Sequence, residues 1–413
     1  MRIPRFRRLW LFLLILGPGL IAAIAGNDAG GTATYSIVGA NYGYHMLWML
    51  LLVGISLIVI QEMCARMGVV TGKGLSDLIR EEFGVRWTFF AMAILLVANI
   101  AVTISEFAGI AASLEIFGIT RYLSVPVMVM LIWFLMTRGS YKGVERIFIA
   151  MCFIYVAYIF SGVMARPDWG LALRSTFTPS FSFDINFILI AIAMVGTTVT
   201  PWMQFYLQSS VVEKGIKIKQ YRYQRWDVIL GSIIAVIIAF FIVVACAAVL
   251  FPRGIVIHEA KEAAMALRPF AGNYAYLLFA LGLFASSTLG ASILPLSSSY
   301  AICEAFGWEN GISKKFDEAP IFFTLYTLLI VIGGGVVLFP NTHLISIMLF
   351  SQTANGILFP FILIFMLLLV NKKRLMGEYV NSKFNNFIAG STAIVLILLT
   401  IFLIIATITG KVT

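Results

Sequence analysis

Charge is scarce in this sequence. Of its 413 residues only 12% are charged and 61% are hydrophobic, and the mean hydropathy is +0.98. A typical soluble domain carries about 25% charged residues, so the deficit excludes water as the main solvent. Apolar runs long enough to cross a hydrocarbon core of about 30 Å recur along the whole chain. We therefore predict one membrane domain over residues 1–413, embedded in the lipid bilayer.

Other absences exclude further classes of protein. The four cysteines form no CxxC pair, so neither a disulfide framework nor a zinc site is predicted. The net charge of +10 comes from Lys and Arg in short loops rather than from a long basic face, which excludes nucleic acid as a partner. The sequence contains no HExxH, no GxSxG and no paired membrane aspartates of the protease type. We predict no enzyme, no cofactor and no obligate protein partner.

Apolar runs and the breakers between them give eleven candidate membrane spans. They cover residues 9–41, 46–67, 88–117, 120–137, 145–165, 184–213, 227–251, 271–305, 318–338, 342–370 and 386–410. Residues 1–165 hold helices 1 to 5, residues 184–370 hold helices 6 to 10, and residues 386–410 form helix 11. If the N-terminus is cytoplasmic, 22 of the 29 Lys and Arg residues fall on the cytoplasmic side. This bias predicts a multi-pass protein of a prokaryotic inner membrane with its C-terminus outside.

The N-terminus resembles a secretory signal peptide. Four arginines within the first eight residues precede an apolar run, and Ala23-Ile24-Ala25 has the A-x-A form of a cleavage site. We expect no cleavage, because the chain has ten further spans and a cut there would remove half of the first one.

Helix breakers interrupt two of the long spans near their middle. The first break reads GNDAGG over residues 26–31, and the second reads GTTVTP over residues 196–201. The two breaks lie five spans apart, and a repeat of five spans returns with inverted topology. A matched pair of broken helices predicts a transporter with its binding site near the membrane midplane.

Asp28 is the first residue of the break that needs an explanation. A carboxylate inside an apolar span is costly unless protein, water or an ion becomes its partner. The neighbouring glycines let the helix open and free carbonyls such as that of Ala25. A carboxylate beside free carbonyls offers the oxygen ligands that Mg²⁺, Ca²⁺ and Mn²⁺ favour. Asp28 can instead cap the second half-helix, and both roles are compatible.

The second break carries three threonine hydroxyls. Thr197, Thr198 and Thr200 precede Pro201, which lacks a backbone donor and so leaves a carbonyl free one turn earlier. These oxygens can line the path of a cation. Alternatively, each hydroxyl donates to a preceding carbonyl of its own helix and only softens a kink.

Several blocks in the same order resemble the NRAMP family of divalent-metal transporters, over nearly the whole chain. The blocks are Gly17-Pro18-Gly19, Asp28-Ala29-Gly30-Gly31, ARMGVVTGKGL from Ala65 to Leu75, GTTVTP from Gly196 to Pro201, SQTANGILFPF from Ser351 to Phe361, and NKKRLMG from Asn371 to Gly377. The resemblance implies an all-α polytopic membrane protein of 11 transmembrane helices, with a 5+5 inverted repeat of the LeuT type and broken helices 1 and 6.

The chain departs from the family at the positions that bind metal. The family's first break reads Asp-Pro-Gly-Asn, and its Asp and Asn are metal ligands. Here Asp28 is kept, but Ala29 replaces the proline and Gly31 replaces the asparagine. The sixth-helix methionine of the family aligns with Thr200, and the histidine beyond the proline aligns with Trp202.

The resemblance and the breaks together give a set of candidate site residues. The metal site is predicted to comprise Asp28, Ala25, Gly31, Thr197, Thr200 and Gln352. Glu106 aligns with the first acid of the family's third-helix proton relay, while the second acid aligns with Gly109. We therefore expect Glu106 to support the site as an outer partner or a relay group.

These departures imply a preference for magnesium. Loss of the thioether removes the ligand that suits softer metals, and replacement of Asn by Gly is expected to widen the cavity. Mg²⁺ takes oxygen ligands and keeps several waters, as in the magnesium-transporting branch of the family. The prediction is a secondary transporter of Mg²⁺, and also of Mn²⁺, that works by alternating access without proton coupling. The alternatives are a proton-coupled Mn²⁺/Fe²⁺ transporter of the ordinary NRAMP type and a sodium-coupled transporter of an organic solute.

Overall fold

Helices make up the fold of this chain. The structure is a computed structural model that describes residues 17–182, 184–255, 257, 260–340 and 344–408, and these residues contain no β-strand. The predicted all-α class is confirmed. A helix satisfies its backbone donors and acceptors within its own segment, which is what a chain needs in order to cross a bilayer.

Ten stretches of the described chain are long and apolar enough to cross a membrane. They are built from α4 (Leu47–Thr71), α6 (Val85–Ile116), α7 (Arg121–Arg138), α8 (Tyr141–Ile154) with α9 (Val156–Met164), α11 (Ile185–Thr198) with α12 (Pro201–Glu213), α13 (Tyr221–Val249), α14 (Ala260–Phe306), α15 (Pro320–Val337), α16 (Leu344–Val370) and α18 (Lys383–Ile408). The first broken helix consists of α2 (Pro18–Ala25) and α3 (Ala29–Tyr42), each too short to span alone. The total of 11 spans therefore stays a prediction.

The helices differ from the predicted spans in three ways. The fifth span divides into α8 and α9 at Tyr155, and α14 begins at Ala260 instead of residue 271. Short helices that were not predicted lie between spans: α5 (Leu75–Phe83), α10 (Trp169–Phe177), α17 (Lys373–Met376) and the 3-10 turns η1 (Ile218–Gln220), η2 (Phe251–Arg253) and η3 (Gly377–Tyr379). Predicted span residues 9–16, 342–343 and 409–410 lie outside the described residues.

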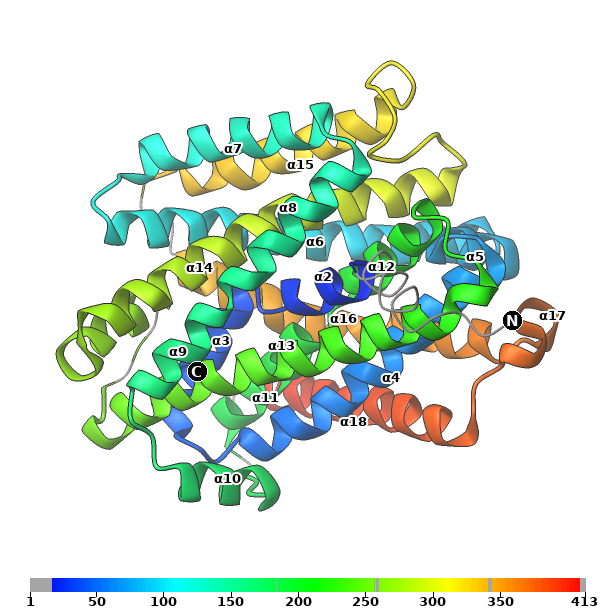
Figure 1. Ribbon diagram of the computed structural model, residues 1–413. Helices are drawn as coiled ribbons and strands as arrows, with labels where there is room; N and C mark the ends of the chain where they lie inside the picture. Colours follow the sequence, from blue (N-terminus) through cyan, green and yellow to red (C-terminus); the bar gives the residue numbers. More distant parts are fainter. Residues whose placement is uncertain (1–16, 183, 256, 258–259, 341–343, 409–413) are drawn as a thin grey trace, which may run out of the picture.

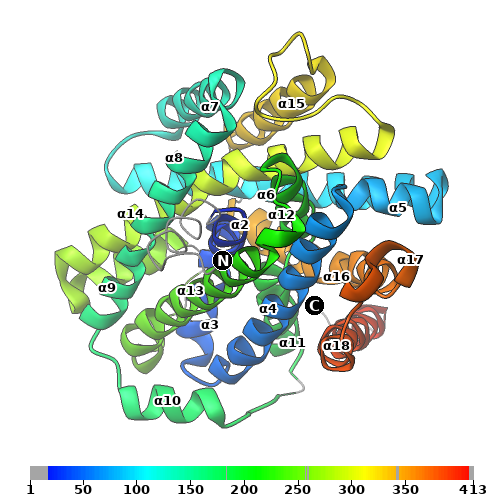
Figure 2. The same cartoon turned by 45° about the vertical axis from the view of Figure 1, so that its right-hand side comes forward.

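The two broken helices lie at the centre of the bundle. All eight residues of α2 are buried, and α3 packs against α6, α11, α13, α14 and α16 (Figure 1). In the segment of α11 and α12, 78% of the most apolar window is buried, whereas the share in α18 is 17%. Figure 2 shows α18 at the outside of the bundle, where it contacts α4, α11 and α16. The interrupted helices are thus shielded from lipid by the continuous ones.

Residues of two sequence blocks, Arg66 of the third and Lys372 and Arg374 of the last, bind other segments of the chain. Glu82 of α5 accepts hydrogen bonds from Lys372 Nζ at 2.8 Å and from the guanidinium of Arg374. Arg66 of α4 reaches the loop that precedes α18, where it donates to Asn381 Oδ1 at 2.5 Å. These contacts fasten the loop between α16 and α18 to the first half of the chain.

We expect Glu82→Gln to lower the thermal unfolding temperature of the purified protein at pH 7 by a few degrees. The Glu82 side chain is 7% exposed and pairs with two cations, and hydrogen bonds to charged groups contribute about 1.5–3 kcal/mol. The control is Glu81→Gln, which removes a pair with Lys73 whose side chains are 46% and 45% exposed. Such exposed pairs contribute about 0–1 kcal/mol.

The pH dependence of this contribution follows from the hydrogen bond with Lys372, which holds the pKa of Glu82 below its ordinary value. The contribution is complete above the ordinary glutamate pKa of about 4.3 and is lost as the pH falls through the lowered value. The wild type and Glu82→Gln should therefore differ at pH 7 and converge in acid. Equal effects of the two substitutions at pH 7 would contradict the assignment.

Candidate metal site

The first break opens because its backbone donors turn away from the helix. In an unbroken helix the Ala29 N–H would donate to the carbonyl of Ala25, four residues earlier. It donates instead to Glu106 Oε2, at 3.1 Å. The carbonyl of Ala25 has thereby lost its helical donor, as the sequence predicted.

Asp28 both caps a helix and keeps a free oxygen. Its Oδ1 accepts the Gly31 N–H at 2.7 Å, which makes it the N-cap of α3. Its Oδ2 has no hydrogen-bond partner, and the residue is completely buried. The capping role is therefore confirmed, and one carboxylate oxygen is still available for an ion.

Glu106 lies at the same break. Besides accepting from Ala29, it leaves Oε1 without a partner, and it is completely buried. Neither Glu106 nor Asp28 forms an ion pair with a Lys or Arg within the described part of the chain. Two buried acids therefore converge on the N-terminus of α3, whose partial positive charge favours them.

The three threonines of the second break differ from one another. Thr198 Oγ1 donates to the carbonyl of Met194 at 2.7 Å and lies 2.8 Å from Tyr35 Oη, so it has the structural role. The hydroxyls of Thr197 and Thr200 are buried without a partner. Thr200 has an extended backbone ahead of Pro201, which starts α12 at the position where proline is favoured.

Gln352 of α16 reaches the first break from the other half of the chain. Its Nε2 donates to Asp28 Oδ1 at 3.3 Å, and its Oε1 accepts from Asn355 at 3.3 Å. The approach depends on Gly30, since a Cβ at that position would lie 2.1 Å from Gln352 Nε2. Gln352 therefore lies beside Asp28, while its role as a metal ligand stays a prediction.

Gly31 does not widen the site, and that expectation was wrong. A Cβ built on Gly31 would lie 2.7 Å from Thr197 Oγ1, 2.8 Å from the Gly26 carbonyl and 3.3 Å from Asp28 Oδ1. The space left by the missing side chain is therefore taken up by oxygen atoms of both breaks. Gly31 brings Thr197 and Asp28 together instead of leaving a void.

The structure brings most of the predicted residues together. Direct contacts or shared neighbours link Asp28, Gly31, Thr197, Gln352 and Glu106. Ala25 ends the first half of the first break and Thr200 precedes Pro201 in the second break. Among the described residues, neither of them forms a hydrogen bond with Asp28.

Sequence reasoning missed Met203 and Gln61. Met203 lies in the first turn of α12, and its Cε is 2.0 Å from where a Cβ of Gly26 would be. Gln61 of α4 donates to its Sδ at 3.3 Å, while Gln61 Oε1 has no partner. A thioether therefore lies against the first break. Met203 follows Thr200 by three residues, and this spacing places both on one side of a helix. The spacing could have indicated from the sequence that Met203 lies near the break.

This arrangement attracts a cation. Each of the two acids has one oxygen that accepts a hydrogen bond and one buried oxygen without a partner, and burying such an oxygen is unfavourable. Hydroxyl and carbonyl oxygens add ligands that divalent cations such as Mn²⁺ and Mg²⁺ accept. Two broken helices that meet at such a group are typical of transporters with the fold of the LeuT type.

Comparison with known proteins gives the family. The chain matches the family described as natural resistance-associated macrophage protein-like (Nramp) over residues 19–406. It is 30% identical to the divalent metal cation transporter MntH of Clostridium acetobutylicum, over 98% of this chain and 94% of that protein. The chain belongs to the Nramp family.

Solved structures share the fold. The chain is similar to the manganese transporter of Eremococcus coleocola, with a TM-score of 0.78 and 19% identity over 98% of this chain and 88% of that one. It is also similar to MhsT in complex with L-phenylalanine, with a TM-score of 0.63 and 15% identity over 97% of this chain and 98% of that one. Both likenesses confirm the predicted broken-helix architecture.

Proposed function

We propose that this chain is a secondary transporter that carries divalent metal cations across the membrane by alternating access. The observation that supports the site most strongly is the set of buried oxygens without partners at the two breaks, Asp28 Oδ2, Thr197 Oγ1 and Thr200 Oγ1. Buried polar atoms normally have a partner, and a bound cation supplies one to all three. Family membership and the relative named a divalent metal cation transporter support the same function.

Mn²⁺ is the substrate that the relatives favour. Two similar proteins are named divalent metal cation transporter and manganese transporter, and neither name mentions magnesium. The thioether of Met203 beside Gly26 also weakens the reason for a magnesium preference, because soft donors suit Mn²⁺ better than Mg²⁺. We therefore place the NRAMP-type Mn²⁺ transporter ahead of the magnesium-transporting branch.

Mg²⁺ is the second candidate substrate. The unpaired atoms of Asp28, Thr197 and Thr200 are all oxygens, and the sulfur of Met203 already accepts from Gln61. An oxygen-only site with a single carboxylate ligand is the type that binds a partly hydrated Mg²⁺.

Each residue has a distinct part in this proposal. Asp28 is the charged ligand and Ala25 and the two threonines add neutral oxygens, while Gln352 holds the carboxylate from α16. Glu106 fixes the start of α3 by accepting from Ala29. The N-terminus is proposed to lie in the cytoplasm, as the distribution of Lys and Arg indicates.

Asp28→Asn is the direct test of the site. Asparagine still caps a helix but carries no charge, so the protein should stay monodisperse in detergent while uptake of Mn²⁺ into proteoliposomes falls to background. Asn27→Ala is the control, because Asn27 lies in the same break but donates to the Ala235 carbonyl at 2.9 Å. Wild-type uptake by Asp28→Asn would rule out this residue as the charged ligand.

A second prediction concerns the soft donor. Met203→Leu keeps nearly the same volume but removes the sulfur, so uptake of Mn²⁺ and Cd²⁺ should fall several-fold relative to uptake of Mg²⁺. Met67→Leu, at a buried position of α4, is the control and should leave the ratio unchanged. Competition uptake assays measure the order of preference. An unchanged order in Met203→Leu would assign Met203 to packing alone.

A third prediction is that metal uptake proceeds without proton transport. A relay needs a titratable group that can receive a proton from Glu106, and the family's second acid corresponds to Gly109. A Cβ there would lie 2.4 Å from the Ala29 Cβ and 2.3 Å from Ser287 Oγ, so no acid fits. Of the histidines, His45 is exposed, and His258 and His343 lie outside the described residues.

Proteoliposomes that contain a pH-sensitive dye test the coupling. Addition of Mn²⁺ outside, under a negative membrane potential, should give uptake on a metal-sensitive dye without acidification. Acidification that follows the metal dose and disappears in Asp28→Asn would instead establish the proton-coupled mechanism, with Glu106 as the remaining proton carrier.

A further inference from the structure

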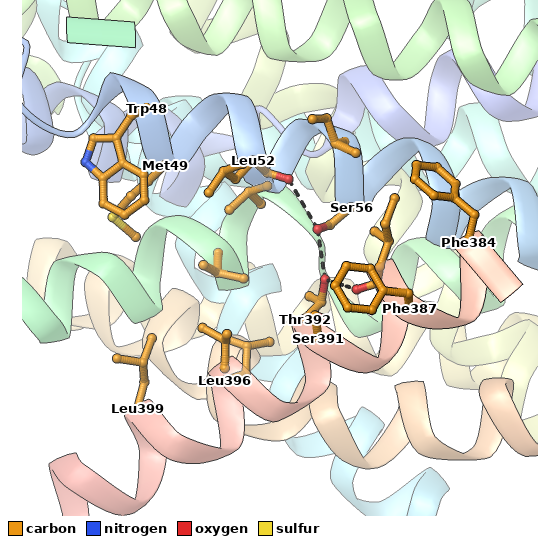
Figure 3. Close-up of a pocket in the computed structure, with 15 residues that line it drawn as sticks. Trp48, Met49, Leu52, Ser56, Phe384, Phe387, Ser391, Thr392, Leu396 and Leu399 are labelled. Carbon is orange, nitrogen blue, oxygen red and sulfur yellow. Dashed lines mark hydrogen bonds between the residues drawn. The ribbon is translucent and has the colours of Figure 1, made fainter. Parts of the chain in front are cut away.

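A groove of about 420 Å³ runs along the outside of the bundle between α4 and α18. Figure 3 shows Trp48 and Leu52 of α4 on one side and Phe384, Phe387 and Leu399 of α18 on the other. Val195 of α11 also contributes to its wall. The groove is thus bounded by three helices, and through Val195 it comes close to the second break.

The lining of the groove suits hydrocarbon. Two of its hydroxyls have partners: Ser56 Oγ and Thr392 Oγ1 lie 2.8 Å apart, so that one donates to the other, and each has a carbonyl of its own helix within hydrogen-bonding distance. The indole N–H of Trp48 donates to the Ser180 carbonyl at 2.9 Å. Apart from the half-buried Ser391 hydroxyl, the groups that line the groove are apolar or already have polar partners.

The groove is long enough to hold a lipid tail that extends through one leaflet. From Phe384 to Leu399 the helix rises about 22 Å, whereas one leaflet of the hydrocarbon core is about 15 Å thick. A tail gains little from moving between lipid and an apolar groove, because lipid tails are as apolar as leucine. Any preference among lipids must therefore come from the headgroup.

Positive charge marks one end of the groove. Lys383 is exposed at the first residue of α18, next to Phe384, and it forms no ion pair within the described residues. Lys372 and Arg374 on the same side are occupied by Glu82. The N-terminus of α18, where Ser382 Oγ accepts the Asn385 N–H, adds its partial positive charge. This side is the one that the Lys and Arg distribution assigns to the cytoplasm, where the leaflet is negatively charged.

We propose that the groove binds one anionic phospholipid, with an acyl chain between α4 and α18 and the phosphate at Lys383. The lipid completes the contact between α18, the least buried spanning helix, and the rest of the bundle. Through Val195 it touches α11 one residue before Gly196, where the second break begins. The binding does not depend on which metal the chain carries.

Native mass spectrometry of the full chain in detergent tests the proposal, with phosphatidylglycerol and phosphatidylcholine of the same acyl chains as probes. The wild type should retain one phosphatidylglycerol in preference to phosphatidylcholine. Lys383→Glu should lower this preference about fivefold or more. Lys219→Glu is the control, because Lys219 is an exposed lysine of η1, on the same predicted side but outside the groove.

A second pair of variants tests the groove itself. Ser391→Phe fills it and should abolish retention of the lipid, whereas Ser391→Ala should not, and both should elute as monodisperse protein. Equal retention of the two lipids by the wild type, equal effects of the two lysine variants, or full retention by Ser391→Phe would overturn the proposal. A dimer that Ser391→Phe converts to a monomer would do so too, since the occupant would then be a second copy of the chain.

Discussion

The start of α3 is the constraint on which the rest of this structure depends. Two carboxylates converge there, since Asp28 caps the helix and Glu106 accepts its first N–H. The helix end offsets part of their charge, but each acid keeps one buried oxygen without a partner. Burial of such groups is tolerated only where other groups or ions complete their surroundings. The opening of the helix and the enclosure of α2 and α3 by continuous helices both serve this need.

Glycine determines how closely the surrounding helices approach this point. Gly196 of α11 packs on α16, where a Cβ would lie 2.4 Å from the Gln352 carbonyl and 2.4 Å from the Gly356 nitrogen. Gly30 admits the Gln352 amide, and Gly31 admits Thr197 Oγ1. Small residues let membrane helices pack backbone to backbone, since apolar association alone gives no drive in lipid. The same glycines that weaken the helices therefore join the two halves of the chain at the site.

The sequence indicated the spans and both breaks because those features depend on local composition. Apolar length, glycine and Pro201 act on their own segment, and the N-cap role of Asp28 needs only the next turn. Which side of each helix faces the site depends instead on packing between distant segments. Nothing local distinguishes Thr198, which donates to its own helix, from Thr197, which does not. Met203 was missed for the same reason, and α5 and α10 because short amphipathic helices resemble loops in an apolar chain.

The broken-helix fold by itself does not decide what is carried, since MhsT shares it and binds L-phenylalanine. The groups that lie at the break bear on which substrate fits. In transporters of organic acids the positive ends of half-helices hold the carboxylate of the substrate. Here the end of α3 is already occupied by the side chains of Asp28 and Glu106, which accept the N–H groups that an organic anion would need. A cation meets the opposite situation. A helix end that can receive an anionic substrate in this fold is here taken by two acids of the chain itself, which is the physical reason for the proposed metal site.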